Sequence, residues 1–218
     1  MDGLASRPQS SPIEVALQGA PRAYAHSVLK RAVDLTAASV GLLATGALLP
    51  IVALAIKLDS RGPVLFLQPR LGLNGRVFQI VKFRTMKSPP GGDNGAPWTM
   101  PQDTRITRVG QLLRALYIDE FPQCWNVLVG HMSAIGPRPE QPGQAAKVLD
   151  KVPDFGQRLA VKPGLTGLAQ VRYGYANTMR DAAVKLRYDM LYIRSCSLWL
   201  DLKIFALTMS RVVCRKGT

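Results

Sequence analysis

Two adjacent carboxylates, Asp119 and Glu120, are the residues whose type and position best suit chemistry. They stand between two segments with helical patterns, just before Phe121 and Pro122. A helix N-terminus attracts phosphate, and adjacent side chains in a helical turn diverge by about 100°. One carboxylate could therefore attack phosphorus while the other holds a divalent metal. The alternative is structural, because acidic residues at a helix start also cap free N–H groups.

Basic residues and turns on either side of this pair suit a substrate that carries phosphate groups. The candidate phosphate-binding residues are Lys82, Arg84, Arg114, Arg138, Lys162 and Thr166. Arg138 stands between two prolines, so little backbone entropy is lost in presenting its guanidinium. Segment 162–167 is a Pro-Gly turn whose N–H groups and Thr166 hydroxyl could cradle an anion. A single basic residue is more often a solvated surface charge, so the number and order of these elements carry the argument.

Several elements must position these residues. An Asn-Gly pair at 74–75 between two apolar runs predicts a β-hairpin over 64–86. Segment 88–97 is rich in Pro and Gly. This is typical of a loop that closes over a site, or of a flexible connection without such a role. We expect helices over 23–34, 106–116, 121–129, 178–194 and 198–213. The last is amphipathic and could lie on a membrane surface or pack against a core.

A run of 22 residues without a charge, 35–56, indicates a membrane anchor. A helix of this length measures about 33 Å, near the thickness of a bilayer core. Pro50 divides the run, and a proline inside a helix bends its axis. Basic residues flank the run on both sides: Lys30, Arg31, Lys57 and Arg61. Cytoplasmic retention of both flanks favours a re-entrant helical hairpin turning at Pro50, and a kinked transmembrane helix with residues 1–30 outside is the alternative.

The composition limits the kinds of partner. Lys and Arg total 28 against 14 Asp and Glu, giving a net charge of +14 and a pI of about 10.2. Such an excess predicts a polyanionic partner: nucleic acid, anionic lipid or a phosphorylated substrate. The sequence has no helix-turn-helix or zinc-binding pattern, so we expect no nucleic-acid partner. A structural membrane adaptor would have no need of the acidic pair. The three cysteines, Cys124, Cys196 and Cys214, form no disulfide framework, which favours a reducing compartment.

Many blocks of the sequence, in one order, resemble the bacterial sugar transferases, the monotopic polyprenyl-phosphate phosphoglycosyl transferases. The resemblance extends from about residue 29 to the end. Its blocks are KRAVD (30–34), GPVLFLQPRLG (62–72), VKFRTM (81–86), DTRITRVGQLLRALYIDEFPQCWNVLVG (103–130), MSAIGPRPE (132–140), VKPGLTGLAQV (161–171), KLRYDMLYI (185–193) and SLWLDLKIFALT (197–208). We expect the small form of this family, consisting of the catalytic core.

The resemblance implies a transfer of sugar-1-phosphate from a UDP-sugar to undecaprenyl phosphate, with release of UMP. Asp119 would attack the β-phosphate and carry the phosphosugar, and Glu120 would help hold Mg²⁺. Lys82, Arg114 and Arg138 match basic family positions near the phosphates. The enzyme would lie on the cytoplasmic face of the bacterial inner membrane, among anionic lipids, in the first membrane step of polysaccharide or glycoconjugate assembly. The sugar and the oligomeric state, with a homodimer as one option, stay open.

Three positions depart from the family pattern. His131 stands where Asp usually precedes Met-Ser, and Leu49 replaces a Ser before the kink proline. Residues 172–175 (Arg-Tyr-Gly-Tyr) replace the common Asn-Gly-Arg, so sugar contacts of other branches do not transfer. His131 as a base is less expected than a structural or surface histidine.

Together these features predict a helix-rich α+β fold in three parts. Residues 1–22 are expected to be a mobile N-terminal segment and 23–59 a membrane-associated re-entrant helix kinked at Pro50. Residues 60–218 are expected to form a compact cytoplasmic catalytic domain with a β-hairpin and surface amphipathic helices.

Overall fold

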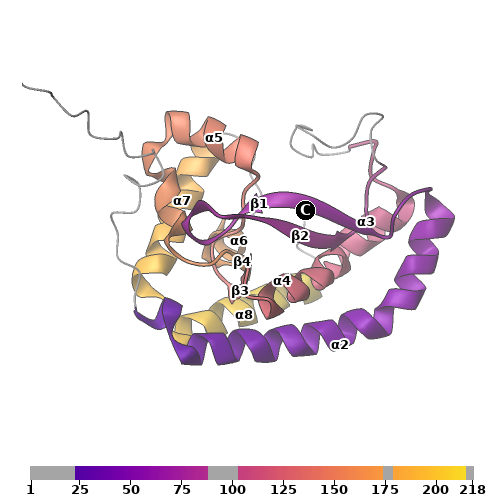
Figure 1. Cartoon of the computed structure of the whole chain (residues 1–218), viewed down its shortest axis with the longest axis horizontal. Helices are drawn as coiled ribbons and strands as arrows, with labels where there is room; N and C mark the ends of the chain where they lie inside the picture. The colour runs from indigo at the N-terminus through magenta and orange to yellow at the C-terminus, as the bar shows by residue number, and fades with distance from the viewer. Residues whose placement is uncertain (1–22, 88–102, 174–178, 215–218) are drawn as a thin grey trace, which may run out of the picture.

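The computed structural model describes residues 23–87, 103–173 and 179–214 (Figure 1). The mobile N-terminal segment and the loop 88–97 that the sequence predicts lie outside these residues. The described chain is a helix-rich α+β structure with two small sheets. This agrees with the predicted fold class.

One long helix, α2 (Val28–Asp59), dominates the N-terminal part and follows a short 3-10 turn, η1 (Ala23–His26). The Ser27 side chain caps its start by accepting from the Lys30 N–H at 3.1 Å. The helix continues through Pro50, where the missing N–H removes one backbone hydrogen bond. Figure 1 shows α2 running along one edge of the molecule and turning upward toward its C-terminal end. The segment is thus one bent helix, and its re-entrant placement in a membrane stays a prediction.

The predicted hairpin is confirmed. Strand β1 (Leu65–Leu71) pairs antiparallel with β2 (Val77–Phe83), and the short 3-10 turn η2 (Leu73–Gly75) joins them. Asn74 and Gly75 adopt φ values of 54° and 74°, which Asn and Gly tolerate better than other residues. The Asn-Gly signal therefore marked the correct reversal of the chain.

The remaining helices follow the hairpin along the chain. Their bounds are α3 (Arg108–Ala115), η3 (Ile118–Gln123), α4 (Cys124–Leu128), α5 (Pro142–Lys151), η4 (Pro153–Ala160), α6 (Leu168–Arg172), α7 (Met179–Ser195) and α8 (Leu198–Val213). The predictions near α3, α7 and α8 are confirmed. Segment 121–129 differs from the single helix expected, because its first part belongs to the 3-10 turn η3 and only Cys124–Leu128 is α-helical.

A second sheet corrects the reading of segment 162–167. Strands β3 (Ser133–Ile135) and β4 (Gly164–Thr166) pair in parallel, so the expected Pro-Gly turn is a strand. The Gly164 N–H donates to the Pro137 carbonyl at 2.8 Å, and the Gly136 N–H donates to the Thr166 carbonyl at 2.9 Å. A Cβ at Gly164 would collide with the Gly136 backbone. The close approach of these backbones requires glycine.

The inner face of α2 completes two apolar clusters of the domain. Ala38 packs with Phe78, Ile80, Val127 and Met132. Val52 and Ile56, one helical turn apart, pack with Phe83 and Leu113. A third and larger cluster contains residues of η4 and of the four helices α5, α6, α7 and α8. The long helix is therefore built into the folded domain along much of its length.

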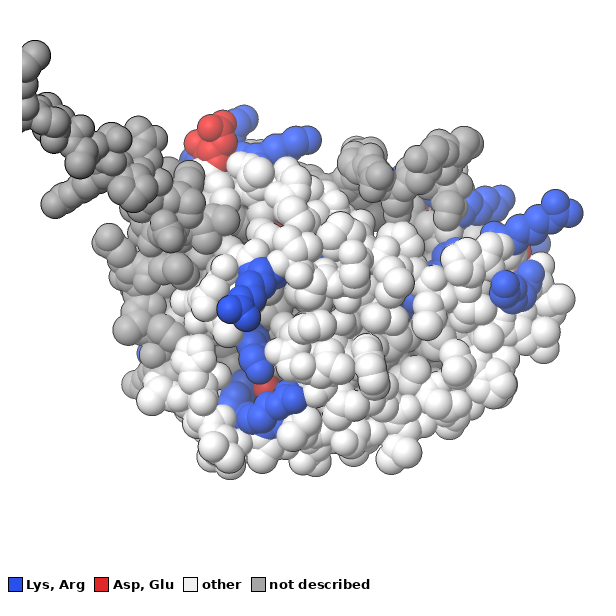
Figure 2. Space-filling model, in the orientation of Figure 1, with Lys and Arg blue, Asp and Glu red and all other residues white. Residues whose placement is uncertain are grey.

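The outer face of α2 is apolar and open. The exposed large apolar side chains on this helix include Val40, Leu43, Leu49, Ile51, Leu54 and Leu58. In Figure 2 the lower edge, along which α2 runs, is mostly free of charged atoms. By length and composition α2 could cross a membrane. Further exposed apolar residues lie on α3, directly after it, and on α4 and α8: Leu112, Leu116, Trp125, Trp199, Leu202 and Phe205.

The cations at the start of α2 are held inside the fold and are not available to lipid head groups. Lys30 is 4% exposed; its Nζ lies 2.8 Å from Asp201 Oδ2 and 3.2 Å from Asp34 Oδ1. Arg31 donates to the carbonyls of Val127 and Leu128, each at 2.7 Å, where α4 ends. Both residues are used inside the fold because α2 docks on the domain at this end.

Candidate active site

The two carboxylates that stand out in the sequence lie side by side in η3, at the junction of α3 and α4. Tyr117, immediately before η3, has the left-handed conformation with φ of 56°, and no side chain caps this turn. Among the described residues, no backbone N–H donates to the Asp119 or Glu120 carboxylate. The capping interpretation is therefore wrong for both, and the pair is available for another task.

Glu120 is held by two cations from different parts of the chain. Lys82 Nζ, near the end of β2, lies 3.0 Å from Glu120 Oε1, and Arg138 Nη2 lies 2.8 Å from the same oxygen. Burial by itself would raise the pKa of Glu120. The charges and hydrogen bonds of Arg138 and Lys82 outweigh this effect and hold the pKa well below its ordinary value. Glu120 is therefore a fixed anion at neutral pH.

Asp119 has a different environment. It is 9% exposed, and no hydrogen bond reaches its carboxylate from the residues that the structure describes. Burial, followed by the negative charge of Glu120, raises the pKa of Asp119 to about 6, although Lys82, Arg114 and Arg138 oppose the shift. An ionised carboxylate without a hydrogen-bond donor is a better nucleophile than one that is fully solvated or paired.

Two further arginines complete the cationic surroundings. Arg114, on the last turn of α3, donates from Nε to Thr85 Oγ1 at 2.9 Å and is close enough to lower the pKa of Asp119. Arg70 was missed in the sequence. Burial, and then the charge of Arg138, lowers its pKa to about 10. The alternation of the hairpin could have revealed Arg70, because Arg70 pairs with Phe78 and Phe66 with Lys82, so Arg70 and Lys82 share one sheet face.

Three of the candidate phosphate-binding residues lie elsewhere. Arg84 points to the end of α2, where its Nη2 donates to the Ser60 carbonyl at 2.7 Å. Lys162 Nζ lies beside Arg31 near Gly130, and burial and Arg31 lower the pKa of this lysine. The Thr166 hydroxyl lies 2.9 Å from that of Thr208. The structure therefore brings Lys82, Arg114 and Arg138 to the acidic pair and leaves these three away from it.

His131 is exposed, with its ring centroid 5.6 Å from that of Phe78. This matches the surface or structural role expected for it.

The side chains around the acidic pair determine what kind of divalent metal site is possible here. In the described chain no three His, Cys, Asp or Glu side chains form a metal-binding group. Mg²⁺, however, is commonly held by one or two carboxylates together with substrate phosphates and water. The Asp119 carboxylate and Oε2 of Glu120 accept no hydrogen bond within the described part of the chain. The pair fits a Mg²⁺ ion that arrives with a diphosphate better than a metal site made by protein alone.

Several known proteins are similar to this chain in sequence. A Komagataeibacter xylinus protein named undecaprenyl-phosphate glucose phosphotransferase is 45% identical over 202 residues, covering 90% of this chain and 38% of that protein. An Aeromonas hydrophila UDP-N-acetylgalactosamine-undecaprenyl-phosphate N-acetylgalactosaminephosphotransferase is 42% identical over 88% of this chain and 45% of its own length. The exopolysaccharide production protein PSS of Rhizobium leguminosarum bv. phaseoli is 42% identical over 87% of this chain and 98% of its own.

The chain therefore spans less than half of the first two relatives and nearly all of the third. The family model described as bacterial sugar transferase matches residues 25–215, a range that contains every residue of the site described above. The chain belongs to the bacterial sugar transferase family.

Proposed function

We propose that this protein transfers sugar-1-phosphate from a UDP-sugar to undecaprenyl phosphate, with a covalent phosphosugar on Asp119 as intermediate. The observation that carries the proposal is the buried Asp119 carboxylate, without a hydrogen-bond donor in the described chain, among the cations Lys82, Arg114 and Arg138. The printed names of the relatives, which include glucose and N-acetylgalactosamine phosphotransferases, support the reaction class.

The first half-reaction is a displacement at phosphorus. An Asp119 oxygen forms a bond to the β-phosphorus of the UDP-sugar, and the bond from that phosphorus to the bridging oxygen breaks. UMP leaves with the electron pair. The surrounding guanidinium and ammonium groups stabilise the charge that moves onto the leaving phosphate.

The second half-reaction returns the carboxylate. A phosphate oxygen of undecaprenyl phosphate attacks the same phosphorus, the bond to Asp119 breaks, and polyprenyl-diphosphate-sugar is formed. Glu120 keeps Lys82 and Arg138 in position throughout, because both cations contact one of its oxygens. A Mg²⁺ ion held by the acidic pair, Asp119 and Glu120, together with the diphosphate would neutralise phosphate charge.

The attachment of α2 supports a monotopic arrangement on the cytoplasmic face of the bacterial inner membrane. Near its start, Lys30 is paired with Asp201 of α8. At its end, Asp59 accepts from the Val109 N–H at 2.9 Å, and Arg84 binds the Ser60 carbonyl. Because both ends are tied to one globular body, that body and both ends belong on one side of the bilayer. Anionic lipids then surround a strongly basic protein.

The test uses a panel of UDP-sugars, including UDP-glucose, UDP-galactose and UDP-N-acetylgalactosamine, with the detergent-solubilised protein. Without lipid, one donor should release UMP and add one phosphosugar to the peptide that contains Asp119, as detected by mass spectrometry. Undecaprenyl phosphate should then remove the adduct. A direct attack by the lipid on the donor would give neither adduct nor UMP without lipid, and that result would refute the covalent route.

A further inference from the structure

The loop that carries Arg138 is held by donors at four consecutive carbonyl groups. The Gly164 N–H donates to the Pro137 carbonyl at 2.8 Å, and the Leu71 N–H donates to the Glu140 carbonyl at 2.9 Å. Side chains hold the other two. Arg158 Nη2 donates to the Arg138 carbonyl at 2.9 Å, and Arg70 Nη1 donates to the Pro139 carbonyl at 3.1 Å.

The sequence of this loop adds to the restraint. The prolines at 137 and 139 fix φ on both sides of Arg138. With the backbone fixed and its carbonyl groups paired, the loop sets the position from which the Arg138 side chain reaches Glu120.

Arg158 is the donor with the most extensive support. It is 5% exposed and contacts the loop through the Arg138 carbonyl. Its Nε lies 2.9 Å from Asp189 Oδ2, and its Nη1 lies 3.0 Å from Glu140 Oε1. Its guanidinium carbon lies 4.7 Å from the centroid of the Phe155 ring. Each edge of the planar guanidinium therefore has an acceptor, which lysine could not reproduce.

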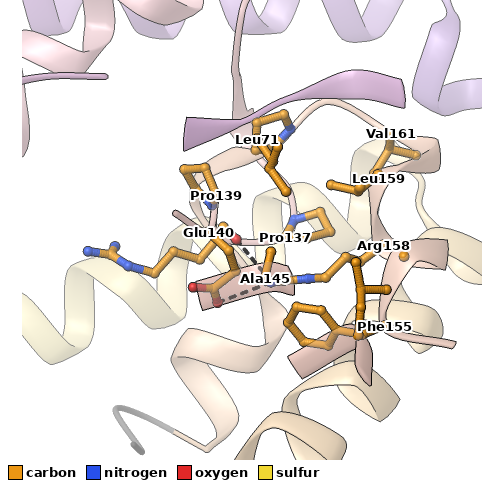
Figure 3. Close-up of a pocket in the computed structure, with 13 residues that line it drawn as sticks. Leu71, Pro137, Pro139, Glu140, Ala145, Phe155, Arg158, Leu159 and Val161 are labelled. Carbon is orange, nitrogen blue, oxygen red and sulfur yellow. Dashed lines mark hydrogen bonds and ion pairs between the residues drawn. The ribbon is translucent and has the colours of Figure 1, made fainter. Parts of the chain in front are cut away.

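Little water can replace these contacts. Figure 3 shows Arg158 beside Glu140 and Phe155, among apolar side chains that include Leu71, Ala145 and Val161. The cavity here is about 10 Å³, at the lower limit for a single water molecule. If Arg158 is shortened, the Arg138 carbonyl loses its donor and the loop gains freedom.

We infer that Arg158 is a positioning residue for the acidic pair: it fixes the backbone of Arg138 so that this arginine clamps Glu120 in the orientation that phosphoryl transfer requires. The inference rests on the proposed function for its catalytic consequence. Its structural part, the path from Arg158 through the Arg138 carbonyl to Glu120, stands on the contacts alone.

The decisive variant is Arg158→Lys, which keeps the charge but loses the planar fork. We expect the kcat for UMP release to fall about ten-fold or more, because small misplacements of a charged group are costly in phosphoryl transfer. The KM for the UDP-sugar should change less than three-fold. In an Arg138→Ala background the same substitution should have no further effect on kcat, because the path then ends at a missing side chain.

A second readout does not depend on turnover. Phenylglyoxal modifies accessible guanidinium groups, and peptide mass spectrometry can follow Arg138 and the exposed reference residue Arg76 in one sample. Arg158→Lys should speed the modification of Arg138 several-fold and leave Arg76 unchanged. The matched control is Arg211→Lys, because Arg211 also donates to a backbone carbonyl, that of Gln170 at 3.2 Å, but contacts another part of the fold. It should alter neither readout.

The outcomes separate the two proposals. If the wild-type protein releases no UMP from any donor, the proposed function fails, and the modification rate still tests the inference. Unchanged modification of Arg138 in folded Arg158→Lys protein, or a kcat loss that recurs in full in the Arg138→Ala background, would overturn the inference. If Arg158→Lys does not fold, Asp189→Asn loosens the same guanidinium from its far side. It should accelerate Arg138 modification to a smaller extent, and no acceleration would also count against the inference.

Discussion

Asp119 and Glu120 are neighbours in the chain, yet the pKa values of their carboxyl groups are shifted in opposite directions. Both are removed from bulk water, but only Glu120 is contacted by Lys82 and Arg138. The pKa of Glu120 is therefore held down, while burial and the Glu120 charge raise the pKa of Asp119 to about 6. Two adjacent groups of the same chemistry are thus separated into a fixed anion and a reactive one.

Replacement of Asp119 by Asn should abolish the phosphosugar adduct, because the amide lacks the anionic oxygen that bonds to phosphorus. The same change should stabilise the fold near pH 7.5. Raising the pKa of a carboxyl from 3.8 to about 6 costs the folded state about 3 kcal/mol once the group is ionised. Asn removes that cost, so we expect a gain of about 1–3 kcal/mol in thermal or denaturant unfolding in detergent.

Retained turnover in folded Asp119→Asn protein would contradict the assignment. A loss of stability would show that the carboxylate makes a favourable contact after all.

The rate of adduct formation should depend on the protonation of Asp119. A pKa of about 6 leaves the carboxylate ionised above that pH and protonated below it. The rate of UMP release without lipid should therefore level off above pH 7 and decline about ten-fold per pH unit well below pH 6. Single-turnover measurements between pH 4.5 and 8 test this. A rate that is constant down to pH 4.5 would mean that Asp119 is not the group that must ionise.

Replacement of Glu120 by Gln should slow both half-reactions while leaving the nucleophile in place. The amide keeps the shape of Glu120 but loses the charge that holds Lys82 and Arg138, so a stability loss of about 1–3 kcal/mol is also expected. Stopped-flow UMP release at increasing Mg²⁺ concentrations checks whether added metal restores part of the rate. Full recovery would indicate a purely metal-binding role, without the clamp.

Lys30 should matter for folding more than for lipid binding. Lys30→Gln would leave the carboxylates of Asp34 and Asp201 buried without their cation, a change that costs about 3–5 kcal/mol in buried ion pairs. The matched control is Lys57→Gln at the exposed far end of the same helix. That variant should have the same unfolding curve as the unsubstituted protein. It should lose only about 1 kcal/mol of binding free energy for vesicles that contain anionic lipid. Equal unfolding curves for the Lys30 and Lys57 variants would refute the structural role of Lys30.

The topology can be tested with a cysteine at position 10. In a Cys214→Ser background, Ser10→Cys should resist a membrane-impermeant maleimide in intact cells and react after lysis. Labelling in intact cells would place the N-terminal segment outside and restore the kinked transmembrane helix. Pro50→Ala should favour a straight span and lower the activity, because a helix that crosses the bilayer separates the two ends that the domain ties together.

Local signals in the sequence predicted a large part of this structure. Apolar periodicity placed α8 at Leu198–Val213, and the Asn-Gly pair placed the hairpin. The short helix α5 was missed because it begins at Pro142-Gly143, residues that usually interrupt helices. The pairing of β3 with β4 was missed because each strand has three residues and their contact is non-local.

The site was predicted less completely, for a geometric reason. Lys82 lies beside the acidic pair, but Arg84, two positions further on, does not, because β2 ends at Phe83 and the Arg84 side chain binds the Ser60 carbonyl. Arg70 was overlooked although it shares a sheet face with Lys82. The buried pairing of Lys30 could not be predicted, because its partner Asp201 is 171 positions away.

The docking of α2 has a practical consequence for the design of fragments. Ala38, Val52 and Ile56 fill gaps next to Phe78, Met132 and Phe83, so deletion of the hydrophobic segment would open two apolar clusters to water. A fragment that begins after residue 60 would expose these core side chains and lose the cation that neutralises Asp201. Removing the anchor would thus yield an aggregation-prone protein instead of a water-soluble enzyme, and crystallisation or screening requires the intact chain in detergent or lipid.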